Sequence, residues 1–494
     1  MLKTHMSERK SLQPAFDIRE VGRVTSVREF IARVQGLPSC LNGQKVEFQE
    51  GDTGMVMGFN HESVLVLVFG NKARLRAGSQ VYSRAEPFVV PVGNGFIGRV
   101  ISSLGAPVDG LGAIAPHSFN SIFRDAPAVM EREPVKDPLE TGLRIIDACF
   151  PIAKGQRQLI IGDRMTGKTT IVTDTIFNQR GKNVLCIYCA IGQSQSTFSK
   201  TLKLLRENGA MDYTTVIAGS ADAPLAEQFL APYSAAALAE YFASKGRDVF
   251  VAFDDLSKHA WAYRQLSLLL ERPPGREAYP GDIFYIHSQL LERAGKFIPE
   301  LGGGTITFFP IVVTIQGDIT GYIQTNVISI TDGQLYLNTA LFQKGFKPAV
   351  DVGLSVSRIG NKALSPAMKE MSGRLRLEYM QYQELLRMTT LKADLSAEAE
   401  MRLRRGELVS WFFTQPKSQP SSLAEQILFL YAIQRGILDP VPQVWKKFKQ
   451  ELWGWMQGSH PELIKEIQEK QVLSPEMKAS MDKAFVDFLQ EAAA

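Results

Sequence analysis

Residues 158–169 read Gln158-Leu159-Ile160-Ile161-Gly162-Asp163-Arg164-Met165-Thr166-Gly167-Lys168-Thr169, an apolar run that leads into a glycine-rich loop. The run predicts a strand buried on both faces. The loop matches the pattern G-x-x-x-x-G-K-[ST], in which glycines let backbone N–H groups converge on phosphate oxygens while the next helix directs its positive end at the same anion. A chance match is the alternative, and the preceding strand makes it less favoured. We therefore predict a phosphate-binding loop.

A loop that binds phosphates needs a positively charged side chain and a metal ion to offset the phosphate charge. Lys168 would neutralise charge on the β- and γ-phosphates, and the Thr169 hydroxyl would ligate Mg²⁺. A carboxylate should follow at the end of a neighbouring strand, and the apolar run Val249–Phe253 ends at Asp254 and Asp255. Asp254 is the better candidate for the magnesium side. An isolated acidic pair opening a surface loop is the competing interpretation.

A catalytic glutamate is expected after the strand that follows the phosphate-loop helix, because an attacking water needs a base that orients it. The residue at that place is Gln193. An amide can hydrogen-bond water but cannot take its proton at neutral pH. On spacing alone the base could lie elsewhere in the chain.

Around this loop the chain divides by its patterns. Residues 19–90 hold short β-branched runs separated by glycine turns, such as Val21–Val27 and Ser63–Phe69, and predict a small closed or nearly closed β-barrel. Residues 91–362 alternate strand and helix patterns, which predicts a parallel sheet in an α/β nucleotide-binding domain. Residues 363–494 are mainly helical in pattern, as in Met371–Met388 and Ile464–Lys470. Residues 1–18 form a tail, and Gln415–Ser422 is the segment most like a linker.

Composition limits the function. The 494 residues carry 55 basic and 51 acidic side chains, a net charge of +4 that is too even for a nucleic-acid-binding face. No apolar stretch is long enough for a transmembrane helix, and the N-terminal residues lack the apolar core of a secretory signal. Four irregularly spaced cysteines favour a reducing cytosol.

Five further segments are similar to the alpha subunit of the F-type ATP synthase head, and the similarity extends over about 19–488. They are Asp254-Asp255-Leu256-Ser257-Lys258, Tyr263-Arg264-Gln265, Pro273-Pro274-Gly275-Arg276-Glu277-Ala278-Tyr279-Pro280-Gly281-Asp282, Ser329-Ile330-Thr331-Asp332-Gly333-Gln334 and Val352-Gly353-Leu354-Ser355-Val356-Ser357-Arg358. Members of that family have a β-barrel, a nucleotide-binding domain and a helical domain, which agrees with the division predicted above.

The resemblance implies a subunit that binds ATP or ADP with Mg²⁺ without turning it over, with Gln193 where the catalytic beta subunit carries glutamate. It implies a hexameric ring alternating with beta subunits around a gamma subunit, a peripheral stalk, ion transport, and a place on the cytoplasmic face of a bacterial-type inner membrane through the membrane sector. Arg358 would reach the catalytic site of the beta subunit, with Ser355 in the same interface segment. Without the resemblance, Arg358 would be interpreted as a salt-bridging arginine.

The residues predicted to contact the nucleotide, from the loop pattern and the resemblance together, are Gly162, Asp163, Arg164, Met165, Thr166, Gly167, Lys168, Thr169, Thr170, Gln193, Asp254, Gln415 and Lys417, with Thr169 and Asp254 on the metal side.

Three features depart from the family pattern. Met165 stands where a glutamine usually touches phosphate, and Lys417 stands where a second adenine-pocket glutamine follows the one matched by Gln415. The N-terminal residues, through Arg19, are shorter and less amphipathic than the helix that docks the peripheral stalk. Without the family, Gln415 and Lys417 would be taken for a solvated loop. These departures favour a divergent branch of the family.

Two alternatives remain open at this stage. A self-sufficient hexameric secretion-type ATPase or helicase would share the loop and the ring but would need its own catalytic glutamate. A scaffold with a vestigial site would not need Lys168, Thr169 and Asp254. Whether H⁺ or Na⁺ is transported depends on other subunits.

Overall fold

The computed structural model describes residues 19–60, 62–70, 74–389, 397–438 and 442–493. The predicted tail, residues 1–18, lies outside the described residues, so its docking to a peripheral stalk stays a prediction. The chain divides after Val89 into two compact units, and each is described by itself.

The first unit is a closed antiparallel barrel with the strand order β1-β2-β5-β4-β3-β6. Its core gathers the inward side chains of alternate positions, Val64, Val66 and Val68 among them. The strands are β1 (Glu20–Arg28), β2 (Ile31–Gln35), β3 (Gln44–Phe48), β4 (Thr53–Phe59), β5 (Val64–Phe69) and β6 (Gln80–Pro87).

The barrel predicted from the sequence is confirmed, but β3 was not among the predicted strands. Its sequence, Gln44-Lys45-Val46-Glu47-Phe48, alternates buried and half-buried residues. Three of its five side chains, Gln44, Lys45 and Glu47, are polar, so the strand has no apolar run. Its pairing with β4 and β6 nevertheless closes the barrel.

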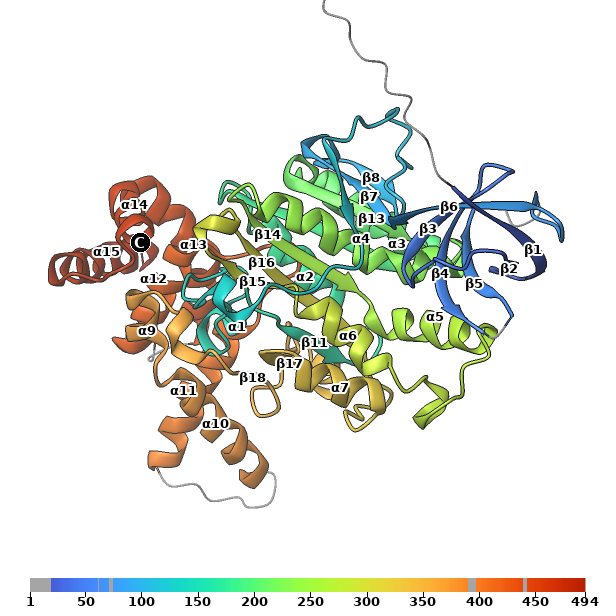
Figure 1. The fold of residues 1–494 in the computed structure, drawn as a ribbon. Helices are drawn as coiled ribbons and strands as arrows, with labels where there is room; N and C mark the ends of the chain where they lie inside the picture. Colours follow the sequence, from blue (N-terminus) through green and yellow to red (C-terminus); the bar gives the residue numbers. More distant parts are fainter. Residues whose placement is uncertain (1–18, 61, 71–73, 390–396, 439–441, 494) are drawn as a thin grey trace, which may run out of the picture. The chain divides into compact units, whose positions relative to one another are not determined.

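The second unit is built on a long, mostly parallel sheet in the order β18-β17-β11-β16-β14-β12-β13-β8, with β15 and β10 attached beside β16 (Figure 1). A small separate sheet pairs β7 with β9. The strands are β7 (Val89–Val92), β8 (Val100–Ser102), β9 (Ser118–Ser121), β10 (Arg132–Glu133), β11 (Leu159–Gly162), β12 (Val184–Ile191), β13 (Thr214–Gly219), β14 (Asp248–Asp254), β15 (Gly295–Phe297), β16 (Thr305–Val313), β17 (Gly333–Leu337) and β18 (Val356–Ser357).

The apolar runs predicted as central strands are confirmed as β11, β12 and β14, and all their residues except Asp248 are buried. Parallel neighbours end at the same edge of a sheet, so the carboxyl ends of β11, β12 and β14 converge. Ligands of open α/β sheets bind outside this edge. The phosphate loop follows β11 there.

Helices cover both faces of this sheet. Helix α2 (Lys168–Phe177) and helix α3 (Gln195–Glu207) share a core with Cys186, Tyr188 and Ala190, the alternate residues of β12. Helix α4 (Leu225–Ala243) and helix α5 (Leu256–Leu269) contact each other and the same strand. The remaining helices of this part are α1 (Arg144–Cys149), α6 (Ile283–Leu291), α7 (Tyr322–Ile330) and α8 (Thr339–Gln343), with short 3-10 turns η2 (Asn94–Phe96), η3 (Val129–Glu131), η4 (Ala210–Tyr213), η5 (Arg276–Ala278), η6 (Pro299–Leu301) and η7 (Gly360–Ala363).

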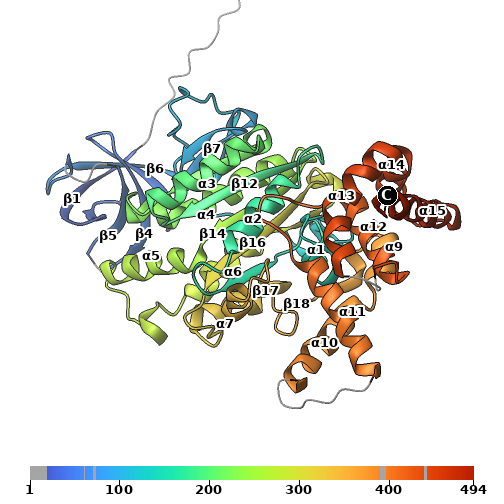
Figure 2. The same cartoon turned by 180° about the vertical axis from the view of Figure 1, so that it is seen from behind.

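The C-terminal part is helical, as predicted, and Figure 2 shows it from the reverse side. Its helices are α9 (Pro366–Ser372), α10 (Leu375–Thr389), α11 (Ala397–Phe413), α12 (Leu423–Gln434), α13 (Pro442–Ser459), α14 (Pro461–Lys470) and α15 (Pro475–Ala493). The helical pattern predicted over Met371–Met388 is divided between α9 and α10, with Gly373 at the junction. Helix α12 is buried at most positions, and its core is continuous with that of the sheet.

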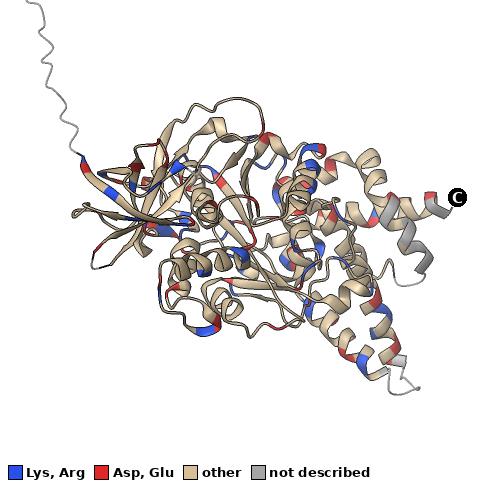
Figure 3. Cartoon of the chain, turned by 90° about the vertical axis from the view of Figure 1, so that its right-hand side faces the viewer, with Lys and Arg blue, Asp and Glu red and all other residues tan. Residues whose placement is uncertain are grey.

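Basic and acidic residues are interspersed along these helices, as the colours of Figure 3 show. Several form ion pairs within or between helices, such as Arg405 with Glu378 and Arg435 with Asp482. Within the described ranges, we find no helix whose length and apolar content would let it cross a bilayer.

Candidate nucleotide-binding site

The loop between β11 and α2 takes a shape that only glycine permits at two places. A Cβ on Gly162 would lie 2.6 Å from the carbonyl oxygen of Leu337, which is closer than atoms can approach. Gly167 has a φ of 98° and caps the N-terminus of α2. The loop therefore closes tightly, and the first N–H groups of α2 are directed toward it.

Lys168 is folded back onto this loop. Its Nζ donates to the carbonyl oxygen of Gly162 at 2.9 Å and to that of Asp163. Burial lowers the pKa of Lys168 to about 8, although the charges of Asp255 and Asp254 oppose the shift. A phosphate at the loop would offer this buried ammonium the anionic partner that the two carbonyl groups only partly replace.

The predicted contact Asp163 holds the loop through its side chain. Its Oδ1 accepts hydrogen bonds from the Thr314 hydroxyl at 2.6 Å and the Gly317 N–H at 2.8 Å, and its Oδ2 accepts one from Thr339 at 2.9 Å. Arg164 and Met165 are both exposed, Met165 by 90%. Asp163 and Arg164 border a cavity of about 700 Å³. A second cavity extends along α2, and neither residue lines it.

The predicted magnesium ligands lie together. The Thr169 hydroxyl donates to Asp254 Oδ2 at 2.8 Å, and Asp254 is 5% exposed at the end of β14. The neighbouring Asp255 instead caps α5 by accepting from the Lys258 N–H at 2.8 Å. Burial, together with the charge of Asp254, raises the pKa of Asp255 to about 6. Asp254 is thus the carboxylate beside the loop.

A hydroxyl and a carboxylate oxygen are the hard ligands that Mg²⁺ prefers, so these two residues fit the ion. Among the described residues, no group of three or more His, Cys, Asp or Glu side chains could form a metal site by itself. Mg²⁺ usually takes one or two protein ligands together with phosphate and water.

Gln193 lies behind this pair. Its Nε2 donates to Tyr188 Oη at 3.0 Å and to the Asp254 carbonyl oxygen at 3.2 Å, while Tyr188 Oη donates to Asp254 Oδ2 at 2.8 Å. Its Oε1 is buried and receives no hydrogen bond from the described residues. The side chain supports the Asp254 carboxylate and does not line the cavity beside α2.

That cavity has a volume of about 660 Å³, within the range of small-molecule sites. It extends from the loop along α2 to Asp174, and its other walls come from α8, from Lys347–Ala349 and from the segment after α11. Its lining residues are Leu143, Met165, Thr166, Gly167, Lys168, Thr169, Thr170, Ile171, Asp174, Leu337, Phe342, Lys347, Pro348, Ala349, Gln415, Pro416 and Lys417.

Gln415 borders the cavity, but the protein engages its amide. Oε1 accepts from the Arg144 N–H at 3.2 Å, and Nε2 donates to the carbonyl oxygens of Gly142 at 2.9 Å and Gln419 at 2.6 Å. Lys417 is exposed at the rim. The segment is therefore neither a free linker nor a wholly solvated loop, because Gln415 anchors it to the start of α1.

Asp174 is a residue of this cavity that the sequence analysis missed. It is 2% exposed, and its Oδ1 accepts a hydrogen bond from the Ser418 N–H at 3.0 Å. Burial raises the pKa of Asp174 to about 7. The one available signal was a carboxylate among the apolar residues of the phosphate-loop helix.

Ser355 and Arg358 lie outside the cavity. Ser355 is fully buried and its hydroxyl accepts from the Tyr336 N–H at 3.0 Å. Arg358 follows β18 and is exposed, with Nη2 donating to the Ile328 carbonyl oxygen at 3.3 Å. The two side chains therefore have different surroundings, although the residues are close in sequence.

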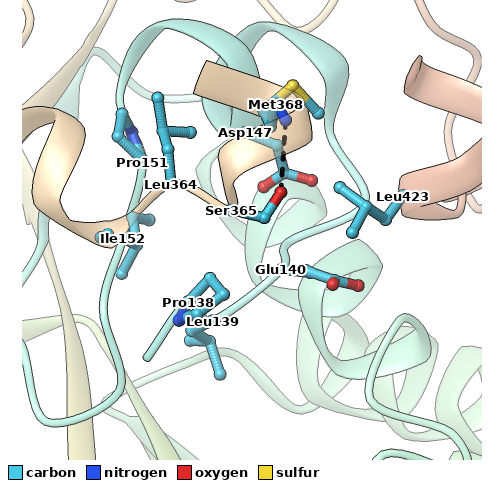
Figure 4. Close-up of a pocket in the computed structure, with 11 residues that line it drawn as sticks. Pro138, Leu139, Glu140, Asp147, Pro151, Ile152, Leu364, Ser365, Met368 and Leu423 are labelled. Atoms are coloured by element: carbon cyan, nitrogen blue, oxygen red, sulfur yellow. Dashed lines mark hydrogen bonds between the residues drawn. The ribbon is translucent and has the colours of Figure 1, made fainter. Parts of the chain in front are cut away.

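A third, much smaller pocket of about 20 Å³ lies between α9 and the segment before α1 (Figure 4). Asp147 at its wall accepts hydrogen bonds from Thr141, Gly142 and Gln426. Ser365 caps α9 by accepting from the Met368 N–H at 3.3 Å. The pocket holds about one water molecule at most, so it serves packing.

Comparison with family models covers most of the chain. Residues 17–84 match the beta-barrel domain of the ATP synthase alpha/beta family, residues 142–357 match its nucleotide-binding domain, and residues 365–488 match the C-terminal domain of the ATP synthase alpha/beta chain. The order of these matches agrees with the barrel, the sheet with its phosphate loop, and the helices described above. The chain therefore belongs to the ATP synthase alpha/beta family.

Proposed function

We propose that this chain is the non-catalytic, Mg-ATP-binding alpha subunit of a rotary F-type ATP synthase. One combination carries the proposal: a complete phosphate loop beside Asp254, and Gln193 in the place of the expected glutamate. The Gln193 amide is hydrogen-bonded to Tyr188 and to the Asp254 backbone. An amide cannot accept the proton of an attacking water at neutral pH, and the Nε2 donors of this one are engaged within the protein.

In this role the residues of the chain bind and orient the nucleotide. Lys168 and the N-terminal N–H groups of α2 would hold the phosphates, and Thr169 and Asp254 would hold Mg²⁺ on the phosphate side. The bound ion would screen the phosphate charge. Tyr188 would keep the Asp254 carboxylate in place, since it donates to the same oxygen as Thr169.

The proposal also includes the subunits with which this chain assembles. We propose that the chain alternates with beta subunits in a hexamer around a gamma subunit, joined to a peripheral stalk and coupled to ion transport at the cytoplasmic face of a bacterial-type inner membrane. The exposed Arg358 would extend to the beta-subunit site, where its planar guanidinium follows charge on the transferring phosphoryl group. Buried Ser355 would position this segment from within the chain.

The direct test is Mg-ATP binding and hydrolysis by the purified chain, with Lys168→Ala as the binding control. We expect saturable binding that the control loses, with turnover far below about 1 s⁻¹. Turnover at or above that rate, absent from the Lys168→Ala control, would favour the self-sufficient secretion-type ATPase or helicase instead. No binding by the wild-type chain would favour a scaffold.

The partner assignment needs a separate measurement. Co-purification from cells that carry the native complex should recover a beta-like subunit that has its own phosphate loop and catalytic glutamate. Recovery of the chain only as a ring of identical copies would contradict the alpha assignment while leaving nucleotide binding intact.

A further inference from the structure

The cavity beside α2 has two chemically different ends. The phosphate end is the N-terminus of the helix, with Lys168, Thr169 and Thr170. Asp174 lies six residues further along α2, about 9 Å at 1.5 Å per residue. The cavity extends along α2 to Asp174, so a nucleotide with its phosphates at the loop would bring its base, the opposite end of the molecule, toward Asp174.

The lining of the cavity includes the apolar residues Leu143, Phe342 and Pro348, of which Phe342 lies at the loop end, 4.0 Å from the position of a Cβ on Gly167. The amide of Gln415 is held by three backbone groups and has its donors engaged. Lys417 offers only hydrogen-bond donors and is exposed. The buried carboxylate of Asp174 is thus the side-chain acceptor at this end of the cavity.

The carboxylate is half engaged. Ser418 N–H donates to Oδ1, whereas no described residue donates to Oδ2. Asp174 borders the cavity, and its Oδ2 is accessible there and keeps its capacity to accept hydrogen bonds. A ligand donor would therefore be stabilised at Oδ2.

We propose that Asp174 determines the base specificity of this site, with Oδ2 accepting a hydrogen bond from the exocyclic 6-amino group of an adenine nucleotide. The inference rests on the proposed nucleotide-binding function. Adenine brings one donor group, the 6-amino group, to this position, and that group needs one available oxygen, which Oδ2 provides.

The test compares two nucleotides that differ only in this group. Dissociation constants of Mg-ATP and of the Mg complex of purine riboside triphosphate, which lacks the 6-amino group, are measured by calorimetry on the full chain. Because burial raises the pKa of Asp174 to about 7, pH 8 keeps the carboxylate ionised. We expect the wild-type chain to bind ATP about tenfold or more tightly than the analogue, as for a hydrogen bond to a charged group.

Three variants assign that preference to Asp174. Asp174→Ala should reduce the ratio to within about twofold, and Asp174→Asn, which keeps a neutral acceptor and is less disruptive to folding, should give an intermediate ratio. The matched control is Thr170→Ala, which lines the phosphate end of the same cavity. It should weaken both nucleotides alike and leave the ratio unchanged.

The possible outcomes distinguish failure of the specificity role of Asp174 from failure of nucleotide binding itself. Equal wild-type affinities for ATP and the analogue, a full preference retained in folded Asp174 variants, or tighter binding of GTP than of ATP would each overturn the specificity role while leaving nucleotide binding in place. Absence of binding by any nucleotide would overturn the proposed function itself, and the specificity role with it.

Discussion

Truncation of the Gln415 side chain should lower the unfolding temperature of the second unit. This result would distinguish a residue that stabilises the fold from one that contacts the nucleotide base. In Gln415→Ala the Arg144 N–H and the carbonyl oxygens of Gly142 and Gln419 each lose one hydrogen bond, although the Gly142 carbonyl oxygen still accepts from the Ser421 N–H. Each hydrogen bond contributes about 1 kcal/mol net, so the free energy of unfolding should fall by about 3 kcal/mol.

The assay is thermal unfolding of the purified chain without nucleotide. For a unit of roughly 400 residues the unfolding entropy is about 0.8 kcal/mol per kelvin, so the unfolding temperature should fall by roughly 4 °C. The matched control is Lys417→Ala, two residues further along the same segment and exposed. Its free energy of unfolding should stay within about 0.5 kcal/mol of wild type.

The affinity of Gln415→Ala for Mg-ATP tests the competing interpretation, in which Gln415 contacts the nucleotide base. If Gln415→Ala unfolds at the wild-type temperature but binds Mg-ATP at least tenfold more weakly, Gln415 reads the base as the family resemblance implies. The hydrogen-bond argument would then be refuted.

The remaining predictions concern the phosphate site, the subunit interface and pH. Lys168→Ala should abolish Mg-ATP binding in calorimetry yet leave the nucleotide-free chain as stable as wild type or slightly more so, because burial already disfavours this charge; a large loss of stability would contradict this. In a reconstituted head with beta subunits, Arg358→Ala should lower turnover by roughly 10³–10⁵ at unchanged assembly, and Arg358→Lys should restore little; turnover within about threefold of wild type would reduce Arg358 to a structural residue. The raised pKa of Asp174 means that its stabilising contribution is present below pH of about 4 and is lost as pH rises through about 7. Between pH 5 and 8 the unfolding temperature should therefore fall further for wild type than for Asp174→Asn, and equal slopes would show that Asp174 does not titrate in this range.

Features set by neighbouring residues could be predicted well. The phosphate loop lies between a strand and a helix that are contiguous with it, so its pattern, its glycines and its place at the sheet edge follow from local spacing. The central strands β12 and β14 were predictable because burial on both faces leaves a continuous apolar run. Strand β3 was missed because three of its five residues are polar, including the buried Gln44, which leaves neither an apolar run nor a regular alternation.

Contacts between residues far apart in the chain have no comparable pattern in the sequence that would predict them. Asp174 meets Ser418, and Gln415 meets Gly142, across more than 240 positions. No local period reports contacts that arise when α2 and the segment after α11 pack together.

The amino-acid sequence by itself therefore determined the order of the barrel, sheet and helices, and where the phosphates of a nucleotide should bind, because both depend on patterns within a single element or loop. Tertiary packing decided which polar groups remain available: it engages both ends of the Gln415 amide and the Nε2 of Gln193 with other parts of the chain, whereas Oδ2 of Asp174 receives no hydrogen bond from the described residues. The physical reason is that a buried polar group must be hydrogen-bonded, and its partner is known only when distant segments come together.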